Sequence, residues 1–241
     1  MRFYFVLLSA FIFFENASAQ SSGGNSFQSQ SPYTGRLVNG FDVLLPTYNS
    51  GSDVGGKPYF SKDWVKGSVK TIKNEEFSNK LLFMYDKVGG KLFFKNEDSA
   101  TIMEADGGMI YSFTLITDKP HVFMRADLFN RDYTGKFFEA LVFNDKKYSL
   151  LKYTATNFEQ ATTSKASQAM TQTLSNGRYV DKETYFLFYN NTLQPVELKK
   201  KAFPKALDNA GSDKAEAYIK MNNGNFNESY ASKLLETLNM Q

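Results

Sequence analysis

The chain contains no cysteine, and this absence excludes several kinds of chemistry. Among its 241 residues there is no thiol for a disulfide framework, a thiolate nucleophile, a cysteine zinc cluster or a lipoprotein anchor. Histidine occurs once, at His121 in KPHVFMRAD, so a catalytic triad or a histidine metal site would depend on this residue. Its place at the start of a strand favours a half-exposed structural role. No zinc spacing, metalloprotease signature or nucleotide-binding glycine loop is present, and we assign no metal site and no cofactor.

The chain also lacks a strong charge of either sign. Its net charge of +3, from 28 basic and 25 acidic residues, is too small to predict nucleic-acid binding. After the first residues, no apolar run approaches the roughly 20 residues that a membrane span needs, so we expect no transmembrane segment after signal cleavage. Aromatic residues are abundant, with 23 Phe and 14 Tyr, and they supply a hydrophobic core.

The first residues have the pattern of a secretory signal peptide. Arg2 precedes an apolar run from Phe3 to Phe14, and the small residues Ala17-Ser18-Ala19 follow. This pattern predicts a signal peptide over residues 1–19, with cleavage between Ala19 and Gln20. A membrane anchor is the alternative, but the run is shorter than a span requires. We therefore expect an exported protein, periplasmic or extracellular.

Composition divides the rest of the chain into three parts. Residues 20–56 are rich in Ser, Gly and Asn, which is typical of a flexible segment. Residues 57–198 have the pattern of a β domain, and residues 199–241 that of a helical segment packed on its sheet. Within the β domain, 157–177 is polar and predicts a mobile loop, with a short amphipathic helix at 166–174 as the alternative.

The β domain consists of short apolar and aromatic runs separated by Gly, Asn and Asp. We predict strands at 67–72, 80–85, 91–95, 101–104, 109–116, 121–125, 137–144, 148–153, 179–189 and 193–198. The short connections force antiparallel neighbours, because a parallel crossover takes a dozen residues or more. The predicted fold class is α+β: a curved antiparallel β-meander, as a half-barrel or sandwich, followed by C-terminal helices.

The helical segment carries three helix signals. Pro204 is compatible with a short helix only in its first turn. Ser212 is a candidate N-cap for a second helix. Asn225, three residues before Glu228, resembles a capping box that would start the third.

Four carboxylates in the stretch 97–106 are the nearest approach to a catalytic constellation. Glu97, Asp98 and Asp106 fall between predicted strands, where such residues stabilise reversals, and Glu104 ends a strand that alternates. Catalytic carboxylates need to converge in a cleft with shifted pKa values. The pattern favours turn chemistry, and we assign no catalytic residue.

Several stretches together resemble uncharacterised exported β-rich proteins of bacteroidete-type Gram-negative bacteria. They are KPYFSKDWVKGSVK, LLFMYDKVGGKLFFKN, MIYSFTL, FFEALVFNDKKYSLLKY and VELKKKAFPKAL, in this order from Gly56 to the C-terminus. The resemblance implies an envelope or secreted protein without assigned function, and it transfers no catalytic residue. Asp98-Ser99-Ala100 is similar to the acceptor pattern for O-linked glycans on exported proteins of that group, which makes Ser99 a candidate glycosylation site.

Three functional hypotheses follow. The first is an exported non-catalytic module that binds an envelope component or a partner protein. The second is a periplasmic carrier of an apolar ligand, held in a cavity between sheet and helices. The third, which the residues favour least, is a hydrolase that uses Asp and Glu. An exposed aromatic patch would support the first, an apolar cavity the second and converging carboxylates the third.

Overall fold

A computed structural model of the chain describes residues 44–46, 48, 54–160 and 177–241. The predicted signal peptide, its cleavage site at Ala19 and Gln20, and most of the segment 20–56 lie outside these residues. Residues 161–176, which make up most of the predicted loop, also lie outside them.

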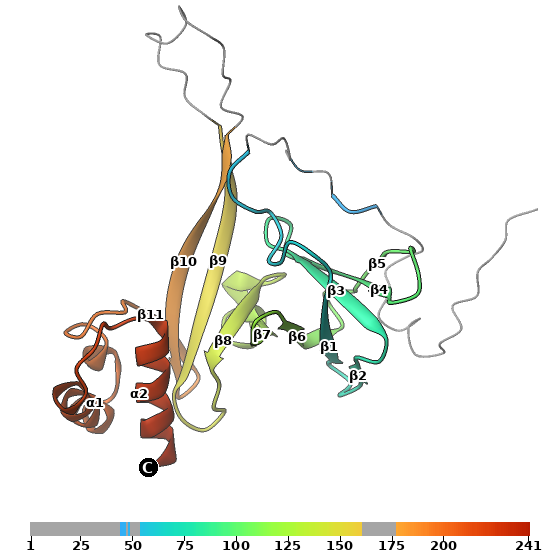
Figure 1. Cartoon of the computed structure of the whole chain (residues 1–241). Coiled ribbons are helices and arrows are strands. Elements are labelled where there is room, and N and C mark those ends of the chain that lie inside the picture. The colour runs from blue at the N-terminus through green and yellow to red at the C-terminus, as the bar shows by residue number, and fades with distance from the viewer. Residues whose placement is uncertain (1–43, 47, 49–53, 161–176) are drawn as a thin grey trace, which may run out of the picture. The chain divides into compact units, whose positions relative to one another are not determined.

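Eleven strands form one antiparallel sheet, in the order β11-β10-β9-β8-β7-β6-β1-β3-β4-β5, with β2 paired to β1 (Figure 1). The strands are β1 (Val65–Thr71), β2 (Glu76–Phe77), β3 (Leu81–Asp86), β4 (Lys91–Asn96), β5 (Met103–Glu104), β6 (Ile110–Ile116), β7 (Pro120–Arg125), β8 (Phe137–Val142), β9 (Ser149–Glu159), β10 (Arg178–Tyr189) and β11 (Thr192–Val196). Each predicted strand overlaps an observed one, and the predicted α+β class is confirmed. Strand β9 extends into the start of the range predicted as a loop, to Glu159, and β10 begins directly after its end, at Arg178.

Strand β1 departs from a simple meander, because it lies between β6 and β3. Val65 and Lys66 pair with β3, whereas the residues from Gly67 onward pair with β6. A Cβ atom on Gly67 would lie 2.0 Å from the carbonyl oxygen of Thr114. The strand can therefore pass this closely to β6 only with glycine at the position where it changes partners.

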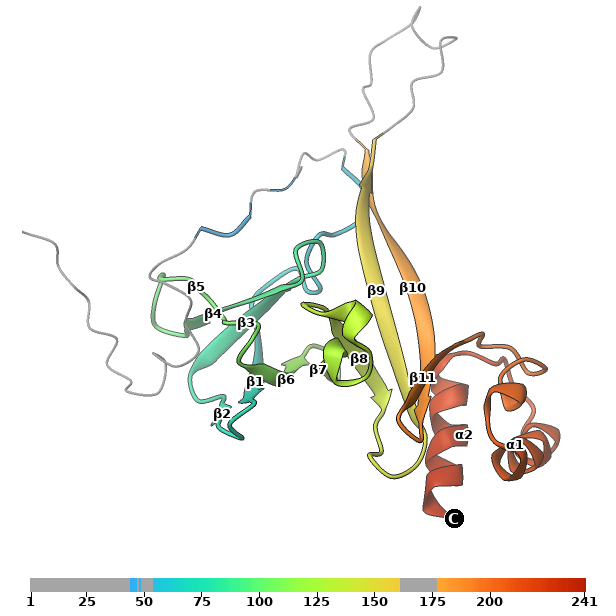
Figure 2. The same cartoon turned by 180° about the vertical axis from the view of Figure 1, so that it is seen from behind.

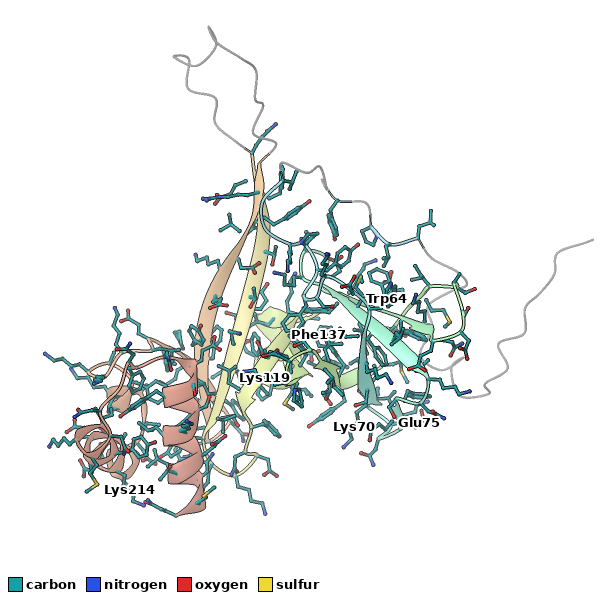
Figure 3. All side chains as sticks on the ribbon, in the orientation of Figure 1. Trp64, Lys70, Glu75, Lys119, Phe137 and Lys214 are labelled. Carbon is teal, nitrogen blue, oxygen red and sulfur yellow. The ribbon has the colours of Figure 1, made fainter. Side chains whose placement is uncertain are left out.

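An aromatic core fills the space beside β1, β3, β4, β6 and β7. Phe113 stacks on Phe123 with ring centroids 4.8 Å apart, and Tyr85 lies 5.2 Å from both rings. Phe137 of β8, labelled in Figure 3, also belongs to this core, where its ring lies 5.0 Å from that of Phe113. Neighbouring strands place these rings on one face, because side chains alternate along a strand.

Two helices cover the other end of the sheet: α1 (Asn209–Met221) and α2 (Glu228–Met240), preceded by the 3₁₀ turn η5 (Pro204–Ala206) (Figure 2). Pro204 starts its turn, as predicted. The predicted caps are wrong by a few residues. Asp208 caps α1 by accepting the N–H of Gly211, and Asn227 caps α2 by accepting that of Tyr230. Among the described residues, no helix combines the length and apolar character that crossing a membrane requires.

The halves of β9 and β10 that lie next to α2, around Leu150 and Leu187, are called the lower half and are buried on both faces. On one face α2 packs against β8 and β9. The residues buried in the hydrophobic cluster on this face are Val142, Tyr148, Leu150, Leu187, Val196, Phe203, Leu207, Ala215, Ala231, Leu234, Leu235 and Leu238. On the opposite face, Leu151 and Phe186 pack with Phe138 under the 3₁₀ turns η2 (Ala126–Leu128) and η3 (Arg131–Tyr133).

A short strap, residues 55–60, connects β10 to β3. Gly55 accepts a backbone hydrogen bond from Tyr179 and donates one to Gly177, and Phe60 donates one to Tyr85. Six strand spacings separate β10 from β3 in the sheet order, about 29 Å if the sheet were flat. The strap spans at most about 18 Å, so it can reach both strands only because the sheet curves.

Candidate functional site

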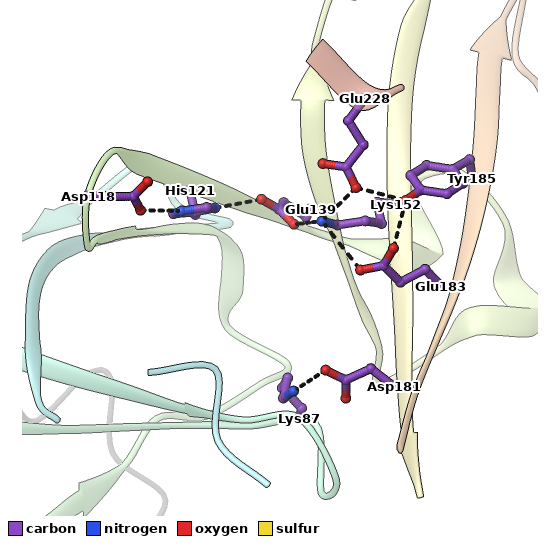
Figure 4. Close-up of polar contacts among 9 residues, drawn as sticks. All are labelled: Lys87, Asp118, His121, Glu139, Lys152, Asp181, Glu183, Tyr185 and Glu228. Atoms are coloured by element: carbon purple, nitrogen blue, oxygen red, sulfur yellow. Dashed lines mark hydrogen bonds and ion pairs between the residues drawn. The ribbon is translucent and has the colours of Figure 1, made fainter. Parts of the chain in front are cut away.

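The curved sheet brings together charged side chains that are distant in the sequence. We call them the charged cluster: His121 on β7, Glu139 on β8, Lys152 on β9, Glu183 and Tyr185 on β10, and Glu228 at the start of α2 (Figure 4). The strand register explains the meeting, since Lys152 lies directly opposite Glu139 on one side and opposite Tyr185 on the other. Directly opposed residues share a face of the sheet.

Lys152 is the centre of the cluster. Its Nζ atom lies 2.9 Å from Glu139 Oε2, 3.1 Å from Glu228 Oε1 and 3.9 Å from Glu183 Oε1. The Tyr185 hydroxyl lies 2.7 Å from Glu183 Oε2 and 2.8 Å from Glu228 Oε1, and its single hydrogen can serve only one of them at a time. Three carboxylates therefore share one ammonium group, and this part of the cluster carries excess negative charge.

His121 extends the cluster towards the turn before β7. Its Nδ1 atom lies 2.7 Å from Glu139 Oε1, and Nε2 lies 3.5 Å from Asp118 Oδ1. A carboxylate only accepts hydrogen bonds, so the contact with Glu139 requires a hydrogen on Nδ1. The imidazole also packs edge-on against Phe60 of the strap, with ring centroids 5.0 Å apart.

Glu139 and Lys152 are held in their ionised forms. Burial would raise the pKa of Glu139, but hydrogen bonds from Lys152 and His121 outweigh burial and place the pKa below its usual value. Burial would lower the pKa of Lys152, but the carboxylates of Glu139 and Glu228 raise it above its usual value. Burial, together with Glu183 and Glu228, raises the pKa of Tyr185. None of these three groups is tuned to exchange a proton near neutral pH.

A cleft of about 160 Å³ opens beside the cluster. Its lining combines four aromatic side chains with charged and polar ones: Phe60, Tyr85, Phe123, Phe137, Lys87, Glu139, Lys152, Thr154, Asp181 and Glu183. Lys87, just after β3, forms a 2.6 Å ion pair with Asp181 of β10 (Figure 4). Thr156 donates a 2.6 Å hydrogen bond to the same carboxylate. The cleft thus lies between strands that only the curvature of the sheet brings close.

A second, wider hollow of about 620 Å³ lies between β7, β8 and α2. His121, Glu139 and Glu228 line it, together with Lys119, Ser232 and Lys233 among others. Glu139 lines both the cleft and this hollow. One buried carboxylate therefore forms part of the wall between them.

The carboxylates that the sequence singled out remain apart from this site. Asp106 accepts the N–H of Gly108 at 2.9 Å, as a turn residue does, and Glu104 forms a 3.0 Å ion pair with Lys91. Glu97 lies 3.6 Å from Lys66 on the surface. The structure therefore supports turn chemistry in this stretch.

The candidate modification site Ser99 is partly exposed in the turn after β4, where its Oγ accepts the N–H of Thr101 at 3.1 Å. Ser99 lies in the same turn as the surface carboxylates and is not part of the charged cluster.

Sequence reasoning missed the charged cluster. A signal was present, because Glu139 interrupts the apolar strand FFEALV and Lys152 interrupts SLLKYT. A charge within a strand that is otherwise apolar has to find a partner across the sheet, since an unpaired buried charge is very unfavourable.

Comparison with known proteins adds no assignment, since no family model, curated protein or solved structure matches this chain. The resemblance to exported bacteroidete-type proteins therefore rests on the sequence stretches alone. In the part of the chain that the structure describes, no three His, Asp or Glu side chains form a group that could hold a metal ion.

Proposed function

We propose that the protein is an exported, non-catalytic module that binds a partner protein or an envelope component at the cleft beside the charged cluster. The observation that carries this proposal is the lining of the cleft. Aromatic rings adjoin a group in which three carboxylates share Lys152. Binding sites typically combine apolar surface with a few fixed polar groups in this way.

The state of the charged groups favours binding over catalysis. A hydrolase based on two carboxyl groups needs one whose pKa is raised, so that it can donate a proton. Here the pKa of Glu139 is lowered, and both of its oxygens accept hydrogen bonds, from His121 and Lys152. Converging carboxylates are present, but Glu139, the one nearest to Lys152, is held as a fixed negative charge.

The packing favours a polar ligand over an apolar one. An apolar carrier would need an apolar cavity between sheet and helices. Buried side chains such as Leu150, Leu187 and Leu235 fill most of that space. Charged groups such as Lys119, Glu139 and Glu228 line the hollow between β7, β8 and α2. The cleft instead lies beyond the helices and is lined by Lys87, Asp181 and other charged groups. A ligand that presents charge or hydrogen-bonding groups matches this lining.

Photo-crosslinking in the native host tests the proposal. A photoreactive phenylalanine analogue would replace Thr154, which lines the cleft, or Ala155, whose side chain points to the opposite face. We expect an adduct at position 154 that is absent at position 155, and mass spectrometry would show whether it is a protein, a glycan or a lipid. No adduct at 154, or the same adducts at both positions, would contradict binding at the cleft.

A further inference from the structure

Strand β10 has an open edge beside the cleft. On one side, β9 pairs with β10 from Arg178 to Phe188. On the other side, β11 pairs only with Tyr185–Tyr189, and the strap contacts Gly177 and Tyr179. Among the described residues, no strand pairs with residues 180–184 on this side, and Figure 2 shows β10 rising beyond β11.

The direction of the free backbone groups follows from the strand period. The N–H of Tyr179 points to the open side, because it donates to Gly55 of the strap. The N–H and C=O of one strand residue point to the same edge of the strand, and those of the next residue point to the opposite edge. The backbone groups of Asp181 and Glu183 therefore point to the open edge, and those of Lys182 point to β9.

The side chains beside this edge supply charge. Asp181 and Glu183 both line the cleft, and both are exposed at its rim. Lys87 neutralises Asp181, but Glu183 shares Lys152 with Glu139 and Glu228. A segment laid along the open edge would therefore meet excess negative charge and aromatic rings on the cleft side.

We propose that an extended segment of a partner protein adds to β10 as a strand along residues 180–184 and places a Lys or Arg side chain in the cleft. This inference rests on the proposed function and specifies the partner. Strand addition draws affinity from main-chain hydrogen bonds and specificity from pockets for alternate side chains. The cationic group would face the carboxylates, while its apolar stem would pack on the aromatic rings.

Peptide binding to the full chain tests the charge requirement. The probe is a fluorescein-labelled peptide, acetyl-TVTRTVT-amide, and its control carries Glu in place of Arg. We expect the Arg peptide to bind at least about tenfold more tightly by fluorescence anisotropy, because opposite charges are then opposed across the new pair. Equal affinities, or no binding by either peptide, would overturn the inference.

Hydrogen exchange tests the edge itself in the unmodified protein. With the Arg peptide bound, the amides of Asp181 and Glu183 should exchange at least about tenfold more slowly. The amide of Lys182, which already points to β9, should be unchanged and serves as an internal control. Binding without protection at Asp181 and Glu183 would overturn strand addition.

A matched pair of variants separates the edge from its charge. Glu183→Pro removes both the carboxylate and the outward N–H, and an edge strand tolerates proline at such a position. Glu183→Gln removes only the charge. We expect the Gln variant to bind the Arg peptide a few-fold more weakly and the Pro variant to lose binding, with thermal melts confirming that both fold. Equal binding by the two variants would overturn the edge contact.

The two proposals fail in distinguishable ways. An adduct at position 154 without amide protection at Asp181 and Glu183 would leave the binding module standing and overturn strand addition. The absence of both adduct and peptide binding would overturn both.

Discussion

Strands β9 and β10 form one continuous pair, but its two halves are built differently. In the lower half, Leu150 and Leu187 pack under α2, Leu151 and Phe186 pack on the opposite face, and β11 covers the outer edge. In the upper half, Thr154, Thr156, Asp181 and Glu183 occupy the positions that continue the helix-covered face. At the outer edge there, no strand of the described residues pairs with residues 180–184.

The change occurs at Lys152 and Tyr185, which contact Glu228 in the first turn of α2. Beyond the first turn of α2 the next positions on this face are polar, and aromatic rings return only at Phe158 and Tyr179, which pack against each other. The lower half thus contributes apolar packing to the fold, whereas the upper half carries the polar side chains on which the proposed binding rests. The experiments below aim to break or sharpen this contrast, from the largest expected effect to the smallest.

Truncating an apolar side chain in the lower half should have the largest effect on stability. Leu150 is fully buried, so Leu150→Ala should lower the free energy of unfolding by about 4 kcal/mol, because it leaves a cavity. Thr154→Ala, on the same face of the upper half, should change it by about 0.5 kcal/mol or less. Urea unfolding measures both, and a similar loss in the two variants would contradict the contrast.

Breaking the charged cluster should have the next largest effect. The Glu139→Gln substitution leaves Lys152 without its nearest carboxylate, and should cost about 3 kcal/mol, the low end for buried ion pairs, because Glu228 still contacts the ammonium group. The double variant Glu139→Leu/Lys152→Leu should recover most of this loss, since neither charge remains buried. A double variant less stable than the single one would show that the pair is needed for folding itself.

Acid should weaken the same contact. The pKa of Glu139 is lower in the folded protein than in the unfolded chain, so the carboxylate stabilises the fold fully above its unfolded pKa, near 4.3. That contribution is lost as the pH falls through the folded pKa. Asp127 and Asp208 also have lowered pKa values and share this dependence. Urea unfolding between pH 7 and pH 3 should therefore show a shallower decline for Glu139→Gln than for the wild type.

The smallest effect is expected outside the pair, in the turns near β4 and β5. Replacing Glu97, Asp98 and Asp106 together by Asn should cost no more than about 0.5 kcal/mol for each residue, because Asn serves a turn almost as well as Asp does. The buried ring of Phe113 is the matched contrast, since Phe113→Ala should cost about 3–5 kcal/mol. If thermal melts showed equal losses, the turn assignment would be wrong.

Much of the fold could be predicted because its signals are local. The Asn190-Asn191 pair, both residues at positive φ, reverses the chain between β10 and β11, and such residues mark a reversal in the sequence alone. The helix caps were missed because several polar residues compete near each start. Asp208 and Asn227 cap their helices, although Ser212 and Asn225 are also suitable residue types.

The candidate site could not be predicted, because it depends on how distant strands meet. Glu139 and Lys152 are cross-strand neighbours, but Glu183 and Glu228 join them only through β10 and the packing of α2. The position of β1 between β6 and β3 is equally non-local, and short-range turn signals contain no information about it. Composition identified polar and apolar runs, but it could not show which charges would share a face.

The open edge of β10 has a further consequence for solubility. An exposed strand edge invites pairing with a second copy of the same strand, which leads to dimers or aggregates. In the antiparallel register centred on Lys182, Asp181 of each copy would lie opposite Glu183 of the other. Like charges directly opposed across strands are destabilising. The carboxylates of Asp181 and Glu183, which suit this edge to a basic segment, therefore also disfavour pairing of the edge with a second copy of the chain.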